Sequence, residues 1–287
     1  ASTILQRPVY LGLSQGLVGY WSFSESKISG TSVQDESGNG KTGTLTNGPT
    51  KVIGKIGQGI NCDGVNDDIN MGNNFAFERT DPFSLSIWYK TNFSSTASVL
   101  ALIGRNSAPG YLLFISGSVA NDPFVFILRN TQTTNEISVT FPRPNDMAWH
   151  HVATTYDGSS SASGVRVYVD GVEQTKSSVI DTLTSSIVST DTFRFCSRPG
   201  SLYLNASVDE GRVYNKVLTP AEVKRLYQIG ASTKINTSIN TGNISQGLVG
   251  YWSFSESKIS GTSVQDESGN GNTGTLTNGP TRTIGKI

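Results

Sequence analysis

The chain begins the same segment twice. Residues 14–56 and 245–287 each contain 43 residues and differ at three aligned pairs: Lys41/Asn272, Lys51/Arg282 and Val52/Thr283. An offset of 231 residues exceeds the roughly 20–50 residues of a solenoid unit and suits a whole domain in a tandem array. We therefore expect a lead-in at 1–13, one complete domain at 14–230, a Thr/Asn/Ser-rich linker at 231–244 and a truncated second repeat at 245–287. The chain reads as an excerpt from a longer protein.

Charge and hydropathy exclude two classes of partner. The sequence has 22 Lys and Arg residues against 22 Asp and Glu, so it lacks the basic surface that nucleic acids require. Apolar stretches such as 99–103 and 124–128 are too short to cross a bilayer, so we expect no membrane insertion. Charged residues make up only 15%, below the usual share of about 25%. A neutral, polar surface of this kind is common in secreted proteins, which predicts an extracellular or cell-surface location.

Strand patterns dominate the first repeat. Short segments rich in β-branched and aromatic residues are bounded by Gly, Asn, Asp, Pro or Ser, which is typical of strands. They lie at 17–23, 83–90, 99–105, 111–116, 124–129, 136–141, 149–156, 165–170, 192–196 and 207–214. Asp170-Gly171 between two Val-containing arms predicts a tight hairpin. Many short strands separated by turns predict an all-β sandwich.

One helix is expected near the end of the repeat. Thr219, Pro220 and Glu222 match a capping box with proline at the first helical position. Apolar side chains then recur on one face of the helix, at Val223, Leu226 and Tyr227. Gly230 can then stop the helix.

Several motifs in order resemble a known family. They are GLVGYWSF, DESGNG with GTL, INCDGVNDDI, FSLSIWYK, WHHVATTYDG, VRVYVDG and VDEGRVYNKVLTPAEV. Together they resemble the laminin-G-like jelly-roll domain of the concanavalin A-like lectin/glucanase superfamily, from Gly16 to about Gly230. The resemblance implies a two-sheet antiparallel β-sandwich with one short C-terminal helix. It does not imply one function, because this fold carries lectins, adhesion modules, glycanases and spacers.

The two cysteines depart from the family pattern. Cys62 stands where an aromatic or aliphatic residue is usual, and Cys196 where a small glycine is usual. A disulfide between them would close a long loop and contribute roughly 4–5 kcal/mol by the loop-entropy argument. We favour the other interpretation, two separate buried thiols.

Catalysis is not expected. Glycanases of this superfamily need two carboxylates that face the groove from one strand, and alternate residues of a strand share a face. The acidic pairs at 35–36, 67–68 and 209–210 are adjacent in sequence and would point to opposite faces. The two histidines, His150 and His151, accompany no nucleophile elbow.

Two acidic, glycine-rich loops could bind calcium. Asp35 and Asn39 belong to one loop and Asp63 to the other, and calcium takes six to eight oxygen ligands from such loops. The family often holds a structural calcium near its final strand, which would implicate Asp209. The alternative is that these side chains cap tight turns through local hydrogen bonds. One structural calcium and pure turn chemistry both stay open.

A candidate ligand face follows from strand alternation. In the expected strands at 83–90, 149–156 and 165–169, every second side chain points to the core. The side chains between them lie on the outer face, and they include Trp88, His151, Arg166 and Tyr168. Aromatic plates flanked by hydrogen-bonding groups suit sugars, so these four are the candidate ligand-binding residues. The alternative, which we favour, is that loops cover this face and the residues form a second, minor core.

The expected function is a non-catalytic recognition or adhesion module, with a glycan or surface glycoprotein as partner. One alternative is a structural repeat or fibre subunit that self-associates head-to-tail by strand exchange. The other is an accessory carbohydrate-binding module of a larger secreted enzyme. The tail at 245–287 carries the first strand of a repeat, and such a strand can bury its apolar side only by joining a sheet. This predicts two possible outcomes: strand exchange with another copy, or a disordered tail.

Overall fold

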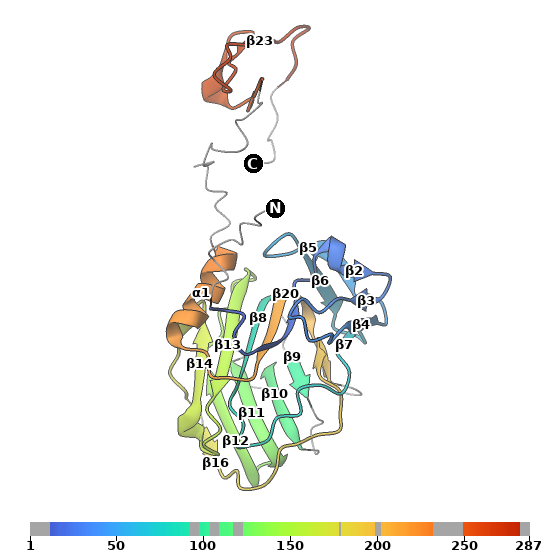
Figure 1. The fold of residues 1–287 in the computed structure, drawn as a ribbon, viewed down its shortest axis with the longest axis vertical. Coiled ribbons are helices and arrows are strands. Elements are labelled where there is room, and N and C mark those ends of the chain that lie inside the picture. Colours follow the sequence, from blue (N-terminus) through green and yellow to red (C-terminus); the bar gives the residue numbers. More distant parts are fainter. Residues whose placement is uncertain are drawn as a thin grey trace, which may run out of the picture. The chain divides into compact units, whose positions relative to one another are not determined.

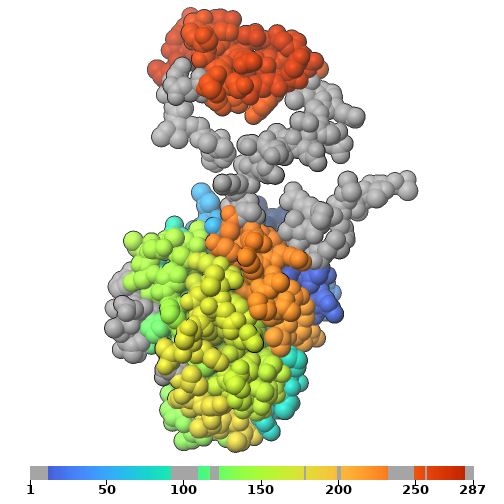
Figure 2. All heavy atoms as spheres, turned by 90° about the vertical axis from the view of Figure 1, so that its left-hand side faces the viewer, coloured from blue at the N-terminus to red at the C-terminus, as the bar shows by residue number. Residues whose placement is uncertain are grey.

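The computed structural model describes residues 12–91, 98–103, 109–116, 123–177, 179–198, 202–231 and 249–281. The chain divides into two compact units, residues 1–233 and 234–287, and each is described by itself (Figures 1 and 2). The predicted linker lies outside the described residues apart from Ala231. None of the described helices is long and apolar enough to cross a bilayer.

One layer of the first unit is an eight-stranded antiparallel sheet (Figure 1). Its strands are β1 (Leu17–Trp21), β5 (Thr50–Ile53), β6 (Gln58–Asp63), β8 (Phe83–Thr91), β13 (His150–Tyr156), β14 (Val165–Val169), β15 (Val172–Glu173) and β20 (Asn205–Tyr214). The order is β15-β14-β13-β8-β20-β6-β5, and β1 also pairs with β20. The long strand β20 therefore joins the first strand of the repeat to the centre of the sheet.

The other layer is a ten-stranded antiparallel sheet. Its strands are β2 (Ile28–Ser29), β3 (Ser32–Val33), β4 (Gly43–Thr46), β7 (Asp68–Asn70), β9 (Ser98–Ile103), β10 (Gly110–Ile115), β11 (Phe124–Thr131), β12 (Asn135–Phe141), β16 (Val179–Asp181) and β17 (Arg194–Phe195). The order is β16-β12-β11-β10-β9-β17-β7-β4-β3-β2. A separate hairpin pairs β18 (Ser197–Arg198) with β19 (Leu202–Tyr203).

The main core lies between the two layers. Alternate residues of each strand enter it, including Phe83, Leu85 and Ile87 from β8 and Phe124 and Phe126 from β11. This is the two-sheet jelly-roll sandwich that the sequence predicts, with one short helix after the last strand.

The helix α1 (Pro220–Ala231) begins as its sequence predicts. Glu222 Oε2 accepts a hydrogen bond from the Thr219 amide at 2.8 Å, and Thr219 Oγ1 accepts one from the Glu222 amide at 3.2 Å. The prediction that Gly230 ends the helix is wrong, because the helix continues to Ala231. Gly230 instead permits close packing: a Cβ there would lie 2.5 Å from the Trp88 ring.

The predicted hairpin at Asp170-Gly171 is confirmed. Val169 and Val172 are paired across it, and both turn residues have positive φ angles of 50° and 76°. Two residues with positive φ are what a type I′ hairpin turn requires.

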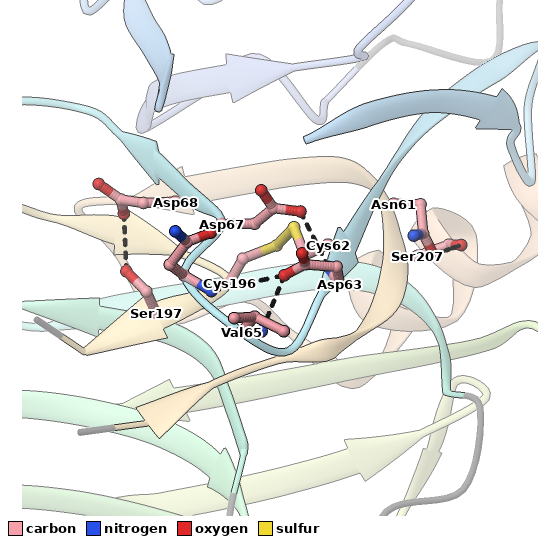
Figure 3. The surroundings of a disulfide bond; sticks show 10 residues. Asn61, Cys62, Asp63, Val65, Asp67, Asp68, Cys196, Ser197 and Ser207 are labelled. Atoms are coloured by element: carbon pink, nitrogen blue, oxygen red, sulfur yellow. Dashed lines mark hydrogen bonds between the residues drawn. A yellow bond between two sulfur atoms is a disulfide. The ribbon is translucent and has the colours of Figure 1, made fainter. Parts of the chain in front are cut away.

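Cys62 and Cys196 form a disulfide, with Cα atoms 6.2 Å apart (Figure 3). The favoured prediction of two separate thiols is therefore wrong. Cys62 lies in β6 of one layer, and Cys196 directly follows β17 of the other. The two cysteines meet only when the layers stack, and no sequence pattern gives their distance. Cys196 has a φ of 71°, a conformation in which glycine has no steric cost, which agrees with the glycine that the family resemblance implies at this position.

The second unit contains a small three-stranded antiparallel sheet. It consists of β21 (Ile259–Ser260), β22 (Ser263–Val264) and β23 (Gly274–Thr275), preceded by a short 3-10 turn at Glu256–Lys258. These elements match β2, β3, the start of β4 and the turn Glu25–Lys27 in the first repeat. The counterpart of β1 is not a strand within residues 249–281.

Candidate functional site

The predicted sugar platform is covered by α1. Trp88 is 1% exposed. The Tyr227 ring stacks on it with centroids 5.6 Å apart, and Lys55 Nζ lies 4.7 Å from its ring centroid. Helix α1 therefore occupies the space that a sugar ring would need over Trp88.

His151 and Tyr168 are also buried beneath the helix. His151 Nε2 lies 2.8 Å from Ser86 Oγ, and burial, together with the nearby Arg212 charge, lowers the pKa of His151 to about 3. Tyr168 packs in a second apolar cluster with Leu218, Val223 and Leu226. The second core is thus present, although a helix covers it rather than the loops that the sequence analysis considers.

Arg166 is separated from the other three candidates by its exposure. Its guanidinium group is on the surface and pairs with Glu173 at 3.1 Å. The structure therefore brings Trp88, His151 and Tyr168 together as buried residues, whereas Arg166 interacts with Tyr168 from the surface. As folded, these four residues form no open ligand face.

The carboxylates predicted to bind calcium accept local hydrogen bonds. Asp35 accepts bonds from the amides of Tyr20, Ser37 and Lys41 at 3.0, 2.9 and 2.9 Å. Burial disfavours its ionised form, but these bonds hold the pKa of Asp35 below its usual range. Asp63 accepts a bond from the Val65 amide at 2.8 Å (Figure 3). This is the turn chemistry that the sequence analysis leaves open as the alternative.

Asn39 and Asp209 complete the predicted calcium set. The Asn39 side-chain amide donates to the Leu17 carbonyl at 3.1 Å, and Asp209 accepts from the Ile56 amide at 2.9 Å. Within the described residues, no three His, Cys, Asp or Glu side chains gather into a group that could hold a metal ion. A calcium ion in these loops stays a prediction.

A pocket opens on the outer face of the ten-stranded sheet. It has a volume of about 260 Å³ and is lined by Leu112, Phe114, Ile127, Arg129, Gln132, Glu136, Arg198 and Leu202. Strand alternation builds its floor: Leu112 in β10 pairs with Ile127 in β11, while their neighbours Leu113 and Phe126 point into the main core. The floor is therefore apolar and belongs to the regular sheet.

Charged side chains gather at the polar end of the pocket. Arg129 and Glu136 are opposite each other on β11 and β12, and both are nearly fully buried. Burial lowers the pKa of Arg129, whereas the Glu136 charge favours its protonated form. Glu136 Oε2 has no hydrogen-bond partner among the described residues. An unpaired buried carboxylate oxygen carries a desolvation cost, and this oxygen is itself closed to solvent in the structure.

Arg198 and Leu202 reach the pocket from the separate hairpin, where they are paired with each other. The disulfide at Cys196 and the bond from Ser197 Oγ to Asp68 Oδ1, at 2.7 Å, anchor the start of this hairpin (Figure 3). Sequence reasoning missed the pocket. The alternation of Val125, Ile127 and Arg129 was a usable signal for the floor, but nothing local indicates that Arg198 would join it.

The family assignment agrees with this architecture. The laminin G-like family of the concanavalin A-like lectin/glucanases superfamily matches residues 63–224. The chain belongs to this superfamily. None of the curated protein sequences matches it.

Solved structures show that this superfamily fold is shared by several binding domains. The binding domain of Paraclostridial Mosquitocidal Protein 1 is similar with a TM-score of 0.59 and 16% identity, over 76% of this chain and 53% of that one. Domain 4 of AbnA, a GH43 extracellular arabinanase from Geobacillus stearothermophilus solved with arabinotriose, has a TM-score of 0.56 and 18% identity, over 74% and 98%.

A third similar structure is the binding domain of Botulinum Neurotoxin DC in complex with SialylT. Its TM-score is 0.57 at 13% identity, over 76% of this chain and 52% of that one. The chain thus spans about half the length of the two toxin fragments. At these identities the likeness establishes the fold.

Proposed function

We propose that the first unit is a non-catalytic glycan-binding module and that the pocket on its outer sheet face holds the sugar. One observation carries this proposal: the pocket combines an apolar floor with two guanidinium groups, an amide and a buried carboxylate. Sugar rings present an apolar face and a rim of hydroxyls, and concave sites with a few placed polar groups recognise such ligands. The solved complexes with arabinotriose and SialylT support a sugar as the ligand class.

We propose a non-catalytic module because of the residues that line the pocket. Retaining glycosidases position two carboxyl groups about 5–5.5 Å apart, and inverting enzymes position them about 6.5–9.5 Å apart. Glu136 is the one carboxylate among the described lining residues. Its cross-strand partner is Arg129, so the described lining does not supply the second carboxyl group that a catalytic pair needs.

The size and charge of the pocket narrow the ligand. Its volume of about 260 Å³ is below the usual range of about 300–1,000 Å³ for drug-sized ligands, so one sugar residue fits. The described lining residues include two arginines, Arg129 and Arg198, and one carboxylate, Glu136. A net positive lining favours an acidic sugar over a neutral one.

An extracellular or cell-surface location is part of the proposal. The disulfide between Cys62 and Cys196 supports it, because disulfides persist in oxidising compartments. The same binding site would serve a module of cell adhesion or an accessory module of a secreted enzyme.

The test is titration calorimetry with a neutral arabino-oligosaccharide and a sialylated oligosaccharide, after a glycan array. Arg198→Ala removes a half-buried guanidinium from the pocket and is expected to weaken binding of the acidic sugar at least tenfold, as loss of a charged hydrogen bond does. Arg166→Ala, an exposed arginine on the other sheet, is the matched control and should change nothing. An array without any bound glycan would contradict the proposal and favour a structural spacer.

A further inference from the structure

One histidine connects the loop between β12 and β13 to the body of the sandwich. His150 is the first residue of β13, and its ring lies between two carboxylates from different parts of the chain. Nδ1 is 2.7 Å from Asp170 Oδ2, in the hairpin turn after β14. Nε2 is 2.7 Å from Asp146 Oδ1, in the loop at 142–149. The imidazole ring therefore joins the loop to the hairpin turn.

Both contacts require a proton on each nitrogen of the ring. An ionised carboxylate can only accept, and a neutral imidazole has one N–H and one lone pair. Burial disfavours the ionised form of Asp170, but the bonds from His150 and from the His151 amide lower its pKa. The bond from His150 also lowers the pKa of Asp146. Because both carboxylates are ionised near neutral pH, only the imidazolium form of His150 donates to both.

Tyr89, Arg143 and His151 are the other titratable side chains that the described elements bring near this ring. The Tyr89 ring of β8 lies with its centroid 6.2 Å away, and burial raises its pKa far above the neutral range. Arg143 of the loop donates to Thr91 Oγ1 at 3.3 Å, and its charge acts on Tyr89. His151 stays neutral, because burial lowers its pKa to about 3. Within this cluster, His150 is therefore the group that changes charge near neutral pH.

The two carboxylates are held with different firmness. Asp170 Oδ1 also accepts the His151 amide at 2.9 Å, and the Asp170 amide donates to the His151 carbonyl at 2.8 Å. Asp146 belongs to four exposed residues at 145–148, which we call the loop tip, and it accepts the Ala148 amide of the same tip at 3.0 Å. A neutral His150 should therefore keep its N–H on Nδ1, toward Asp170, and lose its bond to Asp146.

We propose that His150 is a pH-sensitive latch: its imidazolium holds the loop tip against the hairpin turn, and loss of one proton releases the tip. The backbone of the tip supports this role. Met147 is 57% exposed and has a φ of 58°, a conformation that is uncommon for residues other than glycine. Strain of this kind persists only where surrounding contacts hold it, so a released tip is expected to relax.

The direction of the pH dependence follows from the contacts. The hydrogen bond to Asp170 raises the pKa of His150, burial opposes this, and the bond to Asp146 raises the pKa further. The folded chain thus holds the proton more tightly than an unfolded histidine does, whose pKa is about 6.5. The stabilisation by the latch is complete below about pH 6.5 and is lost as the pH rises through the higher pKa of the folded chain. The tip is held in mildly acidic solution and released in alkaline solution.

An NMR titration of the full chain between about pH 5 and 9 tests the latch. The chain has two histidines, and His151 stays neutral over this range, so the ring that titrates is His150. Its midpoint should exceed the usual value for histidine, and the nitrogen shifts should place the proton of the neutral ring on Nδ1. The amides at 145–148 should lose order in ¹⁵N relaxation with the same midpoint. A midpoint at or below about 6.5, a neutral ring protonated on Nε2, or a tip whose order does not follow the titration overturns the proposal.

Variants separate the latch from ordinary turn chemistry. Asp146→Asn should weaken proton binding at His150 roughly threefold, as loss of an exposed ion pair does, and should leave the tip mobile at every pH. Asp157→Asn is the matched control, because Asp157 is also exposed and accepts the amide two residues on, from Ser159 at 2.9 Å, but it follows the opposite end of β13. This control should change neither the midpoint nor the tip. An Asp146→Asn protein with the midpoint of the unaltered chain would contradict the latch.

Discussion

Residues 14–56, called copy 1, and residues 245–287, called copy 2, are nearly one sequence in two environments. Their differences separate local from non-local determinants of structure. The 3-10 turn and the Asp35 or Asp266 hydrogen bonds occur in both copies, because all their partners lie within the segment. Val33 and Val264 are buried in both, at 0% and 2% exposure. Strand β1 occurs in copy 1 alone among the described residues, because its ladder partner is β20.

The comparison teaches that the segment encodes its own turns but not its first strand. A strand needs a neighbouring strand to satisfy its amides and carbonyls, and an isolated hairpin is marginal in water. Trp21 and Trp252 illustrate the same dependence for side chains. Each ring lies over a nearby glycine, Gly19 or Gly250, but only Trp21 is also covered by the sandwich aromatics.

The largest expected effect comes from the disulfide, which stabilises the sandwich and has no counterpart in copy 2. It joins residues 134 positions apart, and a loop of that length corresponds to about 5 kcal/mol of stability by the chain-entropy model. The variant Cys62→Ala/Cys196→Gly should therefore unfold at a clearly lower Tm by calorimetry. The amide exchange of residues 249–281 should stay as it is.

A matched pair of variants sharpens this prediction. Cys196→Ala places a side chain at a φ of 71°, which costs about 1 kcal/mol relative to glycine. In the Cys62→Ala background, Cys196→Gly should thus be more stable than Cys196→Ala by about that amount. Equal stabilities would show that the backbone relaxes when the disulfide is removed.

A smaller effect is expected where the end of copy 1 meets the sandwich. Burial raises the pKa of Asp209 to about 8, with a further contribution from Glu210, while its carboxylate accepts the Ile56 amide. Because this pKa lies above that of an unfolded aspartate, the folded chain binds the proton more tightly. The contribution to stability is full below about pH 4 and is lost as the pH rises to about 8.

Asp209→Asn should remove that pH dependence. Asparagine keeps an acceptor for the Ile56 amide but carries no charge to bury. The variant should equal or exceed the unaltered chain at pH 8, by an amount on the order of a few kcal/mol, and the difference should vanish near pH 4. Urea unfolding across this range measures it, with the exposed Asp63→Asn as control. A difference that does not change with pH would contradict the assigned burial of the charge.

Much of the fold is predictable because its signals are local. Alternation in β8, β11 and β14, the Thr219 capping box and the Asp170-Gly171 turn each depend on neighbouring residues, and each occurs as expected. The candidate site is less predictable, because its parts meet only through tertiary packing. The alternation that places Trp88 on the outer face is correct, and so is the amphipathic face predicted for α1. Neither pattern indicates that α1 packs over Trp88. Arg198 and the Cys62–Cys196 pair depend on how the two layers stack.

The most direct test of the account compares amide exchange in the two copies by NMR at one pH and temperature. Residues 17–21 and 248–252 are identical in sequence, so their intrinsic exchange rates are equal and any difference reports structure. Because β1 is paired with β20, and residues 249–252 of its counterpart form no strand, the account predicts at least tenfold slower exchange in copy 1. Equal rates in the two copies would contradict the claim that the sandwich, rather than the segment itself, makes the first strand.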